Sequence, residues 1–211
     1  MPDYSLEDSL IERLTLSAAA PVAGLDEVGR GPLAGPVVAC AVVIDRQTLP
    51  PPVADVLDDS KKLSVSKREE LYEILARTTR YALGQASVEE IDTMNILQAA
   101  LLAMQRAFDG LAIRPKAALV DGNRDPGLGC PTDCIVRGDS RSMSIAAASV
   151  IAKVTRDRQM ADLARIFPGY GWETNVGYGS KAHLAALREL GPTPHHRTSF
   201  APVKDLIDAK V

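Results

Sequence analysis

Four acidic residues stand where predicted strands end, and they are the groups in this chain best suited to chemistry. Asp26 and Glu27 close one apolar run, Asp121 closes the run AALV, and Asp139 follows IVRG. Ligand sites in sheet proteins gather at strand ends, and crowded carboxylates either take up protons or bind cations. An all-oxygen set suits Mg²⁺ or Mn²⁺. The pattern therefore predicts a site that hydrolyses phosphodiester bonds with two metal ions.

These four residues are not equivalent. Asp26 and Asp121 are expected to be the main ligands, and Asp139 would hold a metal ion on the side of the attacking water or of the leaving group. Glu27 is harder to place, because neighbours on a regular strand face opposite ways. It can serve the same site only if the strand is kinked, or if it acts through its backbone carbonyl or a water. Taken singly, an Asp at a strand end is more often a turn former, so the prediction depends on all three strand ends.

A turn rich in glycine follows the first acidic pair. Gly29, Arg30 and Gly31 lie in GRGPLAGP. Glycine tolerates backbone angles that other residues resist and allows a ligand to approach the chain closely. The run lacks the Gly-Lys-Ser/Thr ending of a nucleoside-triphosphate loop. A turn that reads a ligand through its backbone and a plain tight connection between two strands are equally good interpretations.

The elements that must position these groups follow from hydrophobic periodicity. An apolar run at 37–44 is typical of a strand buried on both faces. Ser87, with Glu90 three residues later, is the pattern of a capping box and opens a helix that runs to about 109. The first three strands are expected to be antiparallel, and this helix is a crossover that makes the fourth strand parallel to one of them. The prediction is a mixed α/β sheet of five strands with a helical C-terminal region. The strands are expected at 21–29, 37–44, 80–87, 116–122 and 133–139. The helices are expected at 66–77, 87–109, from Ser142 or Ser144 to 167, and at 181–190, with a short helix at the end of the tail GPTPHHRTSFAPVKDL.

Composition is that of one globular domain. Of 211 residues, 46% are hydrophobic and 24% are charged, which is ordinary for such a domain. The net charge of −3 argues mildly against indiscriminate nucleic-acid binding. No apolar run is long enough to cross a bilayer, and the acidic N-terminus lacks the pattern of a signal peptide, so a cytoplasmic protein is expected. The odd cysteine count predicts free thiols, and a structural zinc site is disfavoured because Cys130 and Cys134 have no second pair.

Several segments together resemble a known family. The run GLDEVGRGPLAGPVVACAV (24–42) closely resembles the opening signature of bacterial ribonuclease HII, the type 2 ribonuclease H. Further segments resemble the same family in the same order: DDSKKLS (58–64), LVDGN (119–123), RGDSRSMSIAAASVIAKVTRD (137–157), GYGSKAHLAAL (177–187) and HHRTSFAPV (195–203). The resemblance implies a ribonuclease H-like sheet core at about 20–167 and a C-terminal helical substrate-binding segment at about 168–211.

The resemblance also implies an activity and a set of site residues. The activity would be endonucleolytic cleavage of RNA in RNA–DNA hybrids and on the 5′ side of single ribonucleotides in duplex DNA. The catalytic and metal-binding carboxylates would be Asp26, Glu27, Asp121 and Asp139, with Mn²⁺ or Mg²⁺. The turn Gly29-Arg30-Gly31 would inspect the 2′-hydroxyl that distinguishes RNA from DNA, and Tyr178 would stack on a sugar. Relatives often have His-Lys where this chain has Asn175-Val176, so one basic contact to the substrate would be missing.

The supporting residues have a competing interpretation, as solvated surface charges or helix caps. His195 and His196 are expected to have a structural or phosphate-contacting role. The partners would be RNA–DNA hybrids and duplex DNA that contains ribonucleotides, with no protein partner and a monomeric state. Two alternatives remain open at this point, a non-catalytic module that binds hybrids and a nuclease of the same fold that ignores the sugar. The candidate phosphate contacts are Ser60, Lys61, Lys62, Ser140, Arg141, Ser144, Lys153, Arg156 and Lys181.

Overall fold

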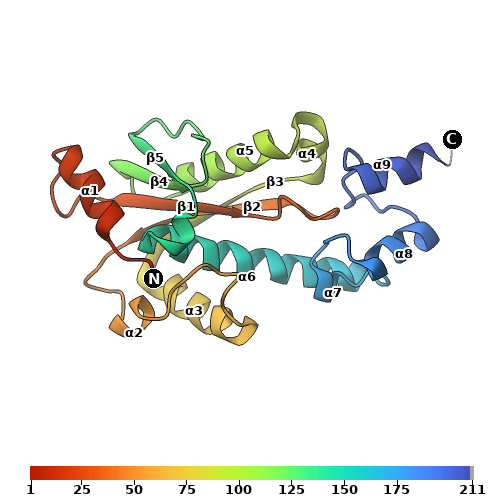
Figure 1. The fold of residues 1–211 in the computed structure, drawn as a ribbon, viewed down its shortest axis with the longest axis horizontal. Helices are drawn as coiled ribbons and strands as arrows, with labels where there is room; N and C mark the ends of the chain where they lie inside the picture. The colour runs from red at the N-terminus through yellow and green to blue at the C-terminus, as the bar shows by residue number, and fades with distance from the viewer. Residues whose placement is uncertain (210–211) are drawn as a thin grey trace.

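A mixed sheet of five strands forms the centre of the computed structural model, which describes residues 1–209. The order across the sheet is β3-β2-β1-β4-β5. β1 pairs antiparallel with β2 and parallel with β4, so the predicted meander and crossover are confirmed. The strands are β1 Val22–Val28, β2 Val37–Ile44, β3 Thr79–Ala86, β4 Ala117–Asp121 and β5 Thr132–Ile135 (Figure 1).

Helices cover both faces of this sheet. α5 (Ile96–Asp109) packs on one face, and the long α6 (Met143–Ile166) packs on the other, with α3 (Val65–Thr78) beyond it (Figure 1). With both faces covered, β2 is buried along nearly its whole length, as its continuous apolar run predicts. No helix within residues 1–209 is long and apolar enough to cross a membrane.

Two predicted elements differ from the structure. The helix expected from 87 to 109 is two helices, α4 (Val88–Met94) and α5, which meet at Asn95. The φ of Asn95 is 74°, and its side chain caps α5, so the chain turns there although the capping box at Ser87 forms as predicted. The fifth strand ends at Ile135, and Asp139 lies instead in a short 3₁₀ turn, η1 (Gly138–Ser140).

Three helices have no counterpart in the predicted elements. They are α1 (Ser5–Arg13), α2 (Pro51–Ala54) and α7 (Trp172–Asn175). Leu10 of α1 packs with Leu119 of β4 and Ile145 of α6, so this helix closes the end of the core that β4 would otherwise leave uncovered. α1 has only nine residues, which is too short for its period to distinguish it from a polar N-terminal segment.

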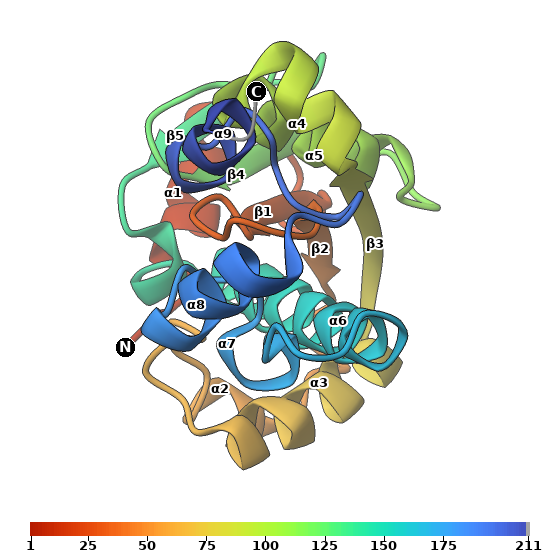
Figure 2. The ribbon, with the colours of Figure 1, turned by 90° about the vertical axis from the view of Figure 1, so that its right-hand side faces the viewer.

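The C-terminal helices α8 (Lys181–Leu190) and α9 (Ala201–Asp208) lie beyond the end of the sheet. The connection between β1 and β2 reaches toward them and lies between α8 and α9 in Figure 2. Trp172 and Leu187 of this region form a cluster with Leu33 and Ala34 of that connection. Asp92 of α4 fixes the segment before α9, because its carboxylate accepts hydrogen bonds from the backbone and hydroxyl groups of Thr198 and Ser199 at 2.6–3.0 Å.

We predict that Asp92→Asn weakens this attachment. Burial opposes ionisation of Asp92, but the four hydrogen bonds outweigh it and hold its pKa below the usual 3.8. The stabilisation is therefore present at neutral pH and is lost as the pH falls through that range. The amide offers one acceptor oxygen in place of two, so the free energy of unfolding should fall by about 1–3 kcal/mol. Urea unfolding measures it, with the exposed Asp109→Asn as the matched control, and equal stability of the two variants would contradict the prediction.

Candidate active site

Pairing of β1 with β4 brings two of the predicted carboxylates together. Leu25 is paired with Val120, so Asp26 and Asp121 follow in register on neighbouring parallel strands. Both point toward α6, because alternate residues of a strand share a face and Gly24 lies so close to that helix that an added Cβ would stand 2.2 Å from its backbone. The two side chains are thus held at the same end of the same face.

The 3₁₀ turn adds a third carboxylate. The backbone N–H of Gly138 donates to Oδ1 of Asp121 at 2.7 Å, which ties η1 to the end of β4. Burial, the charges on Asp59 and Asp121, and a hydrogen bond with Asp59 raise the pKa of Asp139 to about 6. Asp59 was not among the predicted site residues. Its position in the charged run DDSKKLS is equally typical of a solvated loop.

Asp26 is buried, with 7% of its surface exposed, the same fraction as Asp139. Burial is the main reason that its pKa lies well above the usual value, and the charges on Glu27, Asp121 and Asp139 add to the shift. The Ser149 hydroxyl of α6 opposes it. Ser149 is a second residue that the sequence did not single out, because it lies within an apolar helical run.

Glu27 behaves as strand geometry requires. β1 stays regularly paired with β2 through Val28, so a kink does not turn Glu27 toward α6. Its Oε1 accepts from Arg30 at 3.2 Å, while Oε2 is buried and has no hydrogen-bond partner among residues 1–209. Burial raises the pKa of Glu27, with Arg30 opposing and Asp121 adding to the rise. Of the routes by which Glu27 could serve the site, a kinked strand is therefore wrong.

The donor set fits a hard divalent cation, although the protein's own donors engage these oxygens in this conformation. Asp26 accepts from the Glu27 N–H at 2.7 Å, Asp121 from Gly138, and Glu27 from Arg30. Within residues 1–209, no three His, Cys, Asp or Glu side chains are arranged to hold an ion as they stand. A carboxylate carries two oxygens with several lone pairs, so these bonds leave acceptor capacity for a cation. The buried acceptor of Glu27 and the crowded carboxylates would gain a positive partner from it.

Lys61 is the predicted basic residue that faces the carboxylates. Burial lowers the pKa of Lys61, but the charges of Asp26, Asp59 and Asp139 outweigh burial and raise it. Lys62 is turned aside, since its ammonium pairs with Asp58 at 2.9 Å. Lys61 is therefore the lysine of this loop placed to neutralise charge at the site.

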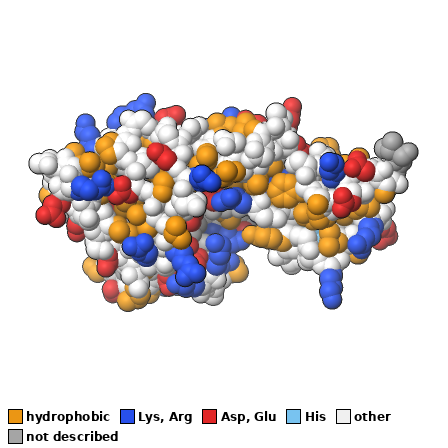
Figure 3. Space-filling model, turned by 45° about the horizontal axis from the view of Figure 1, so that its top comes forward, with side chains coloured by type: hydrophobic (Ala, Val, Ile, Leu, Met, Phe, Trp, Pro, Cys, Tyr) orange, Lys and Arg blue, Asp and Glu red, His pale blue; other side chains and the backbone are white. Residues whose placement is uncertain are grey.

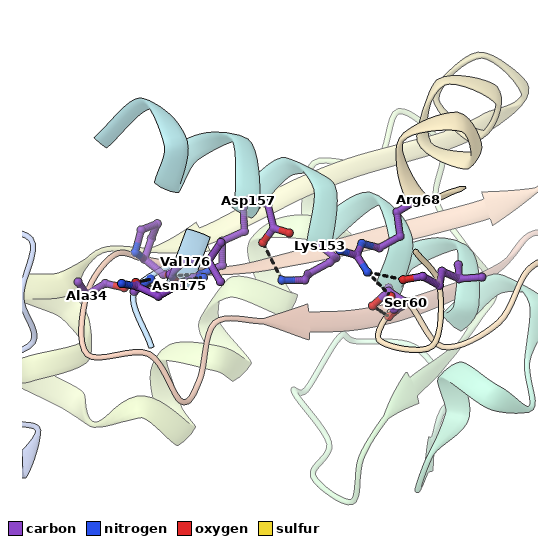
Figure 4. A network of polar contacts seen from close by, with 12 residues as sticks. Ala34, Ser60, Arg68, Lys153, Asp157, Asn175 and Val176 are labelled. Carbon is purple, nitrogen blue, oxygen red and sulfur yellow. Dashed lines mark hydrogen bonds and ion pairs between the residues drawn. The ribbon is translucent and has the colours of Figure 1, made fainter. Parts of the chain in front are cut away.

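Ser60 and Lys153 are engaged by the protein itself. Ser60 is buried and accepts a hydrogen bond from Ser149 at 2.9 Å, and Arg68 holds its backbone carbonyl. Lys153 forms an ion pair with Asp157 at 2.7 Å on α6. Figure 4 shows Lys153 directed at Asp157 and Arg68 directed at the loop that contains Ser60. Neither predicted contact is freely presented to a phosphate.

Two predicted phosphate contacts are wrong because their side chains are buried away from solvent. Ser144 bonds to Glu7 in the core at 2.6 Å, and Ser142 provides the cap of α6. Arg156 is fully buried and donates to the carbonyls of Ala34, Pro36 and Val176. The remaining candidates lie nearer the surface: Ser140, which donates to the Arg137 carbonyl, and the exposed Arg141 and Lys181.

The glycine turn and Tyr178 lie against each other. An added Cβ on Gly31 would stand 3.3 Å from Cε1 of Tyr178, whose side chain is 47% exposed. Leu33 donates to the carbonyl of Gly177 at 2.8 Å, which fixes the two segments side by side. The two parts of the predicted sugar-binding site, the glycine turn and Tyr178, are therefore adjacent although they lie about 150 positions apart in the sequence.

Arg197 holds the glycine turn in place from the protein interior. It is fully buried and donates to the carbonyls of Gly29, Arg30 and Gly35 at 2.5–3.1 Å. Burial, together with the nearby charge of Arg156, lowers its pKa to about 9. The sequence placed Arg197 in a family segment but gave no sign of this role, because an arginine that binds carbonyls and one that binds phosphate look alike in a sequence.

Val176 adds local strain beside Tyr178. Its φ is 44°, a left-handed conformation that β-branched residues adopt rarely. Arg156 donates to the Val176 carbonyl at 2.9 Å and helps to hold it there. The unusual Asn175-Val176 pair thus lies in the turn that presents Tyr178, and the Asn175 side chain accepts from the Gly177 N–H at 2.8 Å.

Histidines and cysteines lie outside the carboxylate group. His196 is buried, and His195 packs its ring edge against Phe167. Cys40, Cys130 and Cys134 are free thiols. In Figure 3 a notch separates the body that contains the sheet from the smaller C-terminal part, and basic side chains stand beside it.

Comparison with known proteins decides the family. A family model described as Ribonuclease HII matches residues 23–203. The chain belongs to the ribonuclease HII family. It is 59% identical to the ribonuclease HII of Paramagnetospirillum magneticum over 203 residues, which cover 96% of this chain and 97% of that relative. Membership of the ribonuclease HII family makes the chain a ribonuclease H, a hydrolase that acts on RNA–DNA hybrids.

Solved structures agree with the fold of this ribonuclease HII family member. The crystal structure of ribonuclease H2 from Pyrococcus horikoshii superposes with a TM-score of 0.75 at 28% identity, covering 90% of this chain and 98% of that one. Bst-RNase HIII in complex with Mn²⁺ superposes with a TM-score of 0.69 at 20% identity, covering 90% and 70%. The second likeness concerns the fold alone. Both support a ribonuclease H-like sheet.

We predict that Asp26→Asn stabilises the metal-free protein. The pKa of Asp26 is raised by burial and by like charges, so its ionised form destabilises the fold at neutral pH, and this effect vanishes as the pH falls and the group is protonated. The neutral amide should raise the free energy of unfolding at neutral pH by about 0.5–2 kcal/mol. Denaturant unfolding in EDTA measures the change, with the exposed Asp162→Asn as control. A destabilised Asp26→Asn protein would contradict the electrostatic account.

Proposed function

We propose that this ribonuclease H cuts on the 5′ side of single ribonucleotides embedded in duplex DNA, as well as within longer RNA–DNA hybrids, and leaves 5′-phosphate and 3′-hydroxyl ends. One juxtaposition supports the proposal. The carboxylates of Asp26, Asp121 and Asp139 gather at the end of β1, and the same strand leads directly into the Gly29–Gly31 turn against which Tyr178 packs. This proximity supports a site in which phosphate chemistry and sugar recognition occur side by side.

The carboxylates would hold divalent cations. Bst-RNase HIII, which has the same fold, was solved with Mn²⁺, and carboxylate oxygens suit Mg²⁺ equally. Bound cations would supply activation of the attacking water and stabilisation of the leaving oxygen. Asp26 and Asp121 would be the main ligands, with Asp139 beside them and Glu27 contributing its free Oε2 through a water or its backbone carbonyl. Lys61 would neutralise charge on the bound phosphate.

Backbone groups of the turn would read the sugar. A 2′-hydroxyl both donates and accepts hydrogen bonds. Arg197 occupies the carbonyls of Gly29 and Arg30, but within residues 1–209 the N–H groups of Arg30 and Gly31 donate to no protein acceptor. These N–H groups would meet the 2′-hydroxyl, and the exposed ring of Tyr178 would stack on the sugar. A deoxyribonucleotide would leave the donors unmatched.

Such a nuclease would remove ribonucleotides from DNA during replication and repair, working in the cytoplasm as a monomer. The exposed Arg141 and Lys181 would contact the phosphates of the duplex. Nothing in the site favours a non-catalytic binding module, because crowded like charges are unfavourable in a site that holds no cation.

We predict cleavage of a DNA duplex with one embedded ribonucleotide. Wild-type protein should cut 5′ to that ribonucleotide when Mg²⁺ or Mn²⁺ is present and should stop when EDTA is added. Asp26→Asn should lower the rate by at least about 10³-fold, because it removes a ligand that acts with the others as a unit. Asp162→Asn is the control for an exposed carboxylate of no proposed role. Full turnover by Asp26→Asn would eliminate the proposed ligand.

The same duplex with that ribonucleotide replaced by deoxyribonucleotide tests sugar recognition. The free N–H groups of the turn have no hydroxyl to bind there, so cutting should fall to background. Gel analysis of end-labelled strands measures both substrates in parallel. Equal cutting of the two would show a nuclease that ignores the sugar and would end the role proposed for the turn.

A further inference from the structure

A buried chain of hydrogen bonds ends on the backbone of Tyr178. His183 is completely buried, and its Nδ1 lies 2.8 Å from the Tyr178 carbonyl. Its Nε2 faces two groups, the indole N–H of Trp172 at 3.0 Å and Nε2 of His196 at 3.1 Å. Nδ1 of His196 in turn faces the backbone N–H of Thr193 at 2.9 Å. Neither His183 nor Trp172 has a role in the proposed reaction.

The partners fix which nitrogen bears each proton. A carbonyl only accepts, so His183 must carry its proton on Nδ1 and donate to Tyr178. The Trp172 indole only donates, so Nε2 of His183 must accept. Thr193 N–H likewise makes Nδ1 of His196 an acceptor, which leaves the His196 proton on Nε2, directed at His183. In this arrangement the Trp172 and His196 donors share the single lone pair of His183 Nε2, and a second proton on either ring would face a donor.

Further hydrogen bonds hold the Tyr178 carbonyl in one position. It also accepts the Ser180 N–H at 2.8 Å, while the Tyr178 N–H donates to Asn175 at 2.8 Å. The ring that extends from this backbone reaches solvent against Gly31. Orientation of the ring therefore depends on a backbone segment held from the core by His183 and from the turn by Leu33.

We propose that His183 is a positioning residue for sugar recognition, which holds Tyr178 against the glycine turn through its Nδ1–H. The inference depends on the proposed role of Tyr178 in binding the sugar. Its competitor is a plain structural role, in which His183 matters only because its Nε2 satisfies the buried donors of Trp172 and His196. The two roles use different ring nitrogens, so they can be separated.

Two substitutions separate the nitrogens. In His183→Asn the amide nitrogen can take the place of Nδ1 and keep the bond to Tyr178, whereas the acceptor for Trp172 is lost. In His183→Gln the longer amide can place its oxygen where Nε2 stands, so the acceptor is kept and the bond to Tyr178 is lost. Positioning predicts that Gln raises KM for the single-ribonucleotide duplex roughly fivefold, the loss expected for one hydrogen bond, with kcat within about twofold, and that Asn retains the wild-type KM.

A plain structural role predicts the opposite order, with Asn the impaired variant and Gln unchanged, and that result would overturn the proposal. Equal KM for all three proteins would overturn it as well. Wild-type protein that cuts no ribonucleotide duplex would end the proposed function together with this inference, whereas normal wild-type cleavage with an unaffected Gln variant would end the inference alone. Chemical unfolding of each variant shows whether it is folded under assay conditions.

A measurement on the wild-type protein keeps the inference testable if a variant does not fold. Nitrogen-15 NMR of the histidine rings distinguishes the two neutral tautomers. His183 should carry its proton on Nδ1, the less common form, and His196 on Nε2. The indole N–H of Trp172, the sole tryptophan of the chain, should show the shift of a hydrogen-bonded group. His183 protonated on Nε2 could not donate to Tyr178 and would refute the proposal.

Discussion

Repulsion among carboxylates at the ends of β1 and β4 is the constraint around which this protein is built. Asp26 and Asp121 stand in register on neighbouring strands, and η1 adds Asp139 beside them. The sheet pairing and the packing of Gly24 on α6 hold these groups together, although burial and like charges raise the pKa values of Asp26 and Asp139. Protonation or a bound cation would relieve this repulsion. The fold therefore keeps a site that is unfavourable without a cation.

The Gly29–Gly31 turn beside that site has a different requirement. Its backbone must be exposed to bind a ligand and must still keep one conformation. Arg197 and Arg156 fix this conformation by donating hydrogen bonds to backbone carbonyls of the connection between β1 and β2. Burying an arginine is unfavourable unless its donors are paired, and here several carbonyls pair them in place of a carboxylate. A neutral partner set leaves each guanidinium charge uncompensated, as the lowered pKa values of both indicate.

Much of the sheet was predictable because its signals are local. Continuous apolar runs predicted the strands, and the capping box at Ser87 predicted the start of one helix. The break at Asn95 was not predicted, because asparagine tolerates the left-handed conformation found there but also occurs in ordinary helices. Around the site, the grouping of Asp26 with Asp121 followed from strand order. Asp59 could not be predicted, since it reaches Asp139 only through loop geometry. Arg156 was predicted to contact phosphate, but its side chain is buried. Whether an arginine is buried depends on the whole fold and has no local signal in the sequence.

The proposed recognition turn directly follows the strand that contains Asp26, which has a consequence for the C-terminal region. Three residues after Asp26 the chain enters the glycine turn, so displacement of that turn also moves the carboxylate. The groups that fix the turn come from the distant end of the sequence, with Arg197 beneath it and Tyr178 against Gly31. Without these contacts an exposed glycine-rich turn would sample many conformations. Under the proposed function, the C-terminal segment would act on the active site by restricting the glycine turn before a substrate binds, and the hydrogen bonds of Asp92 would help to hold that segment in place.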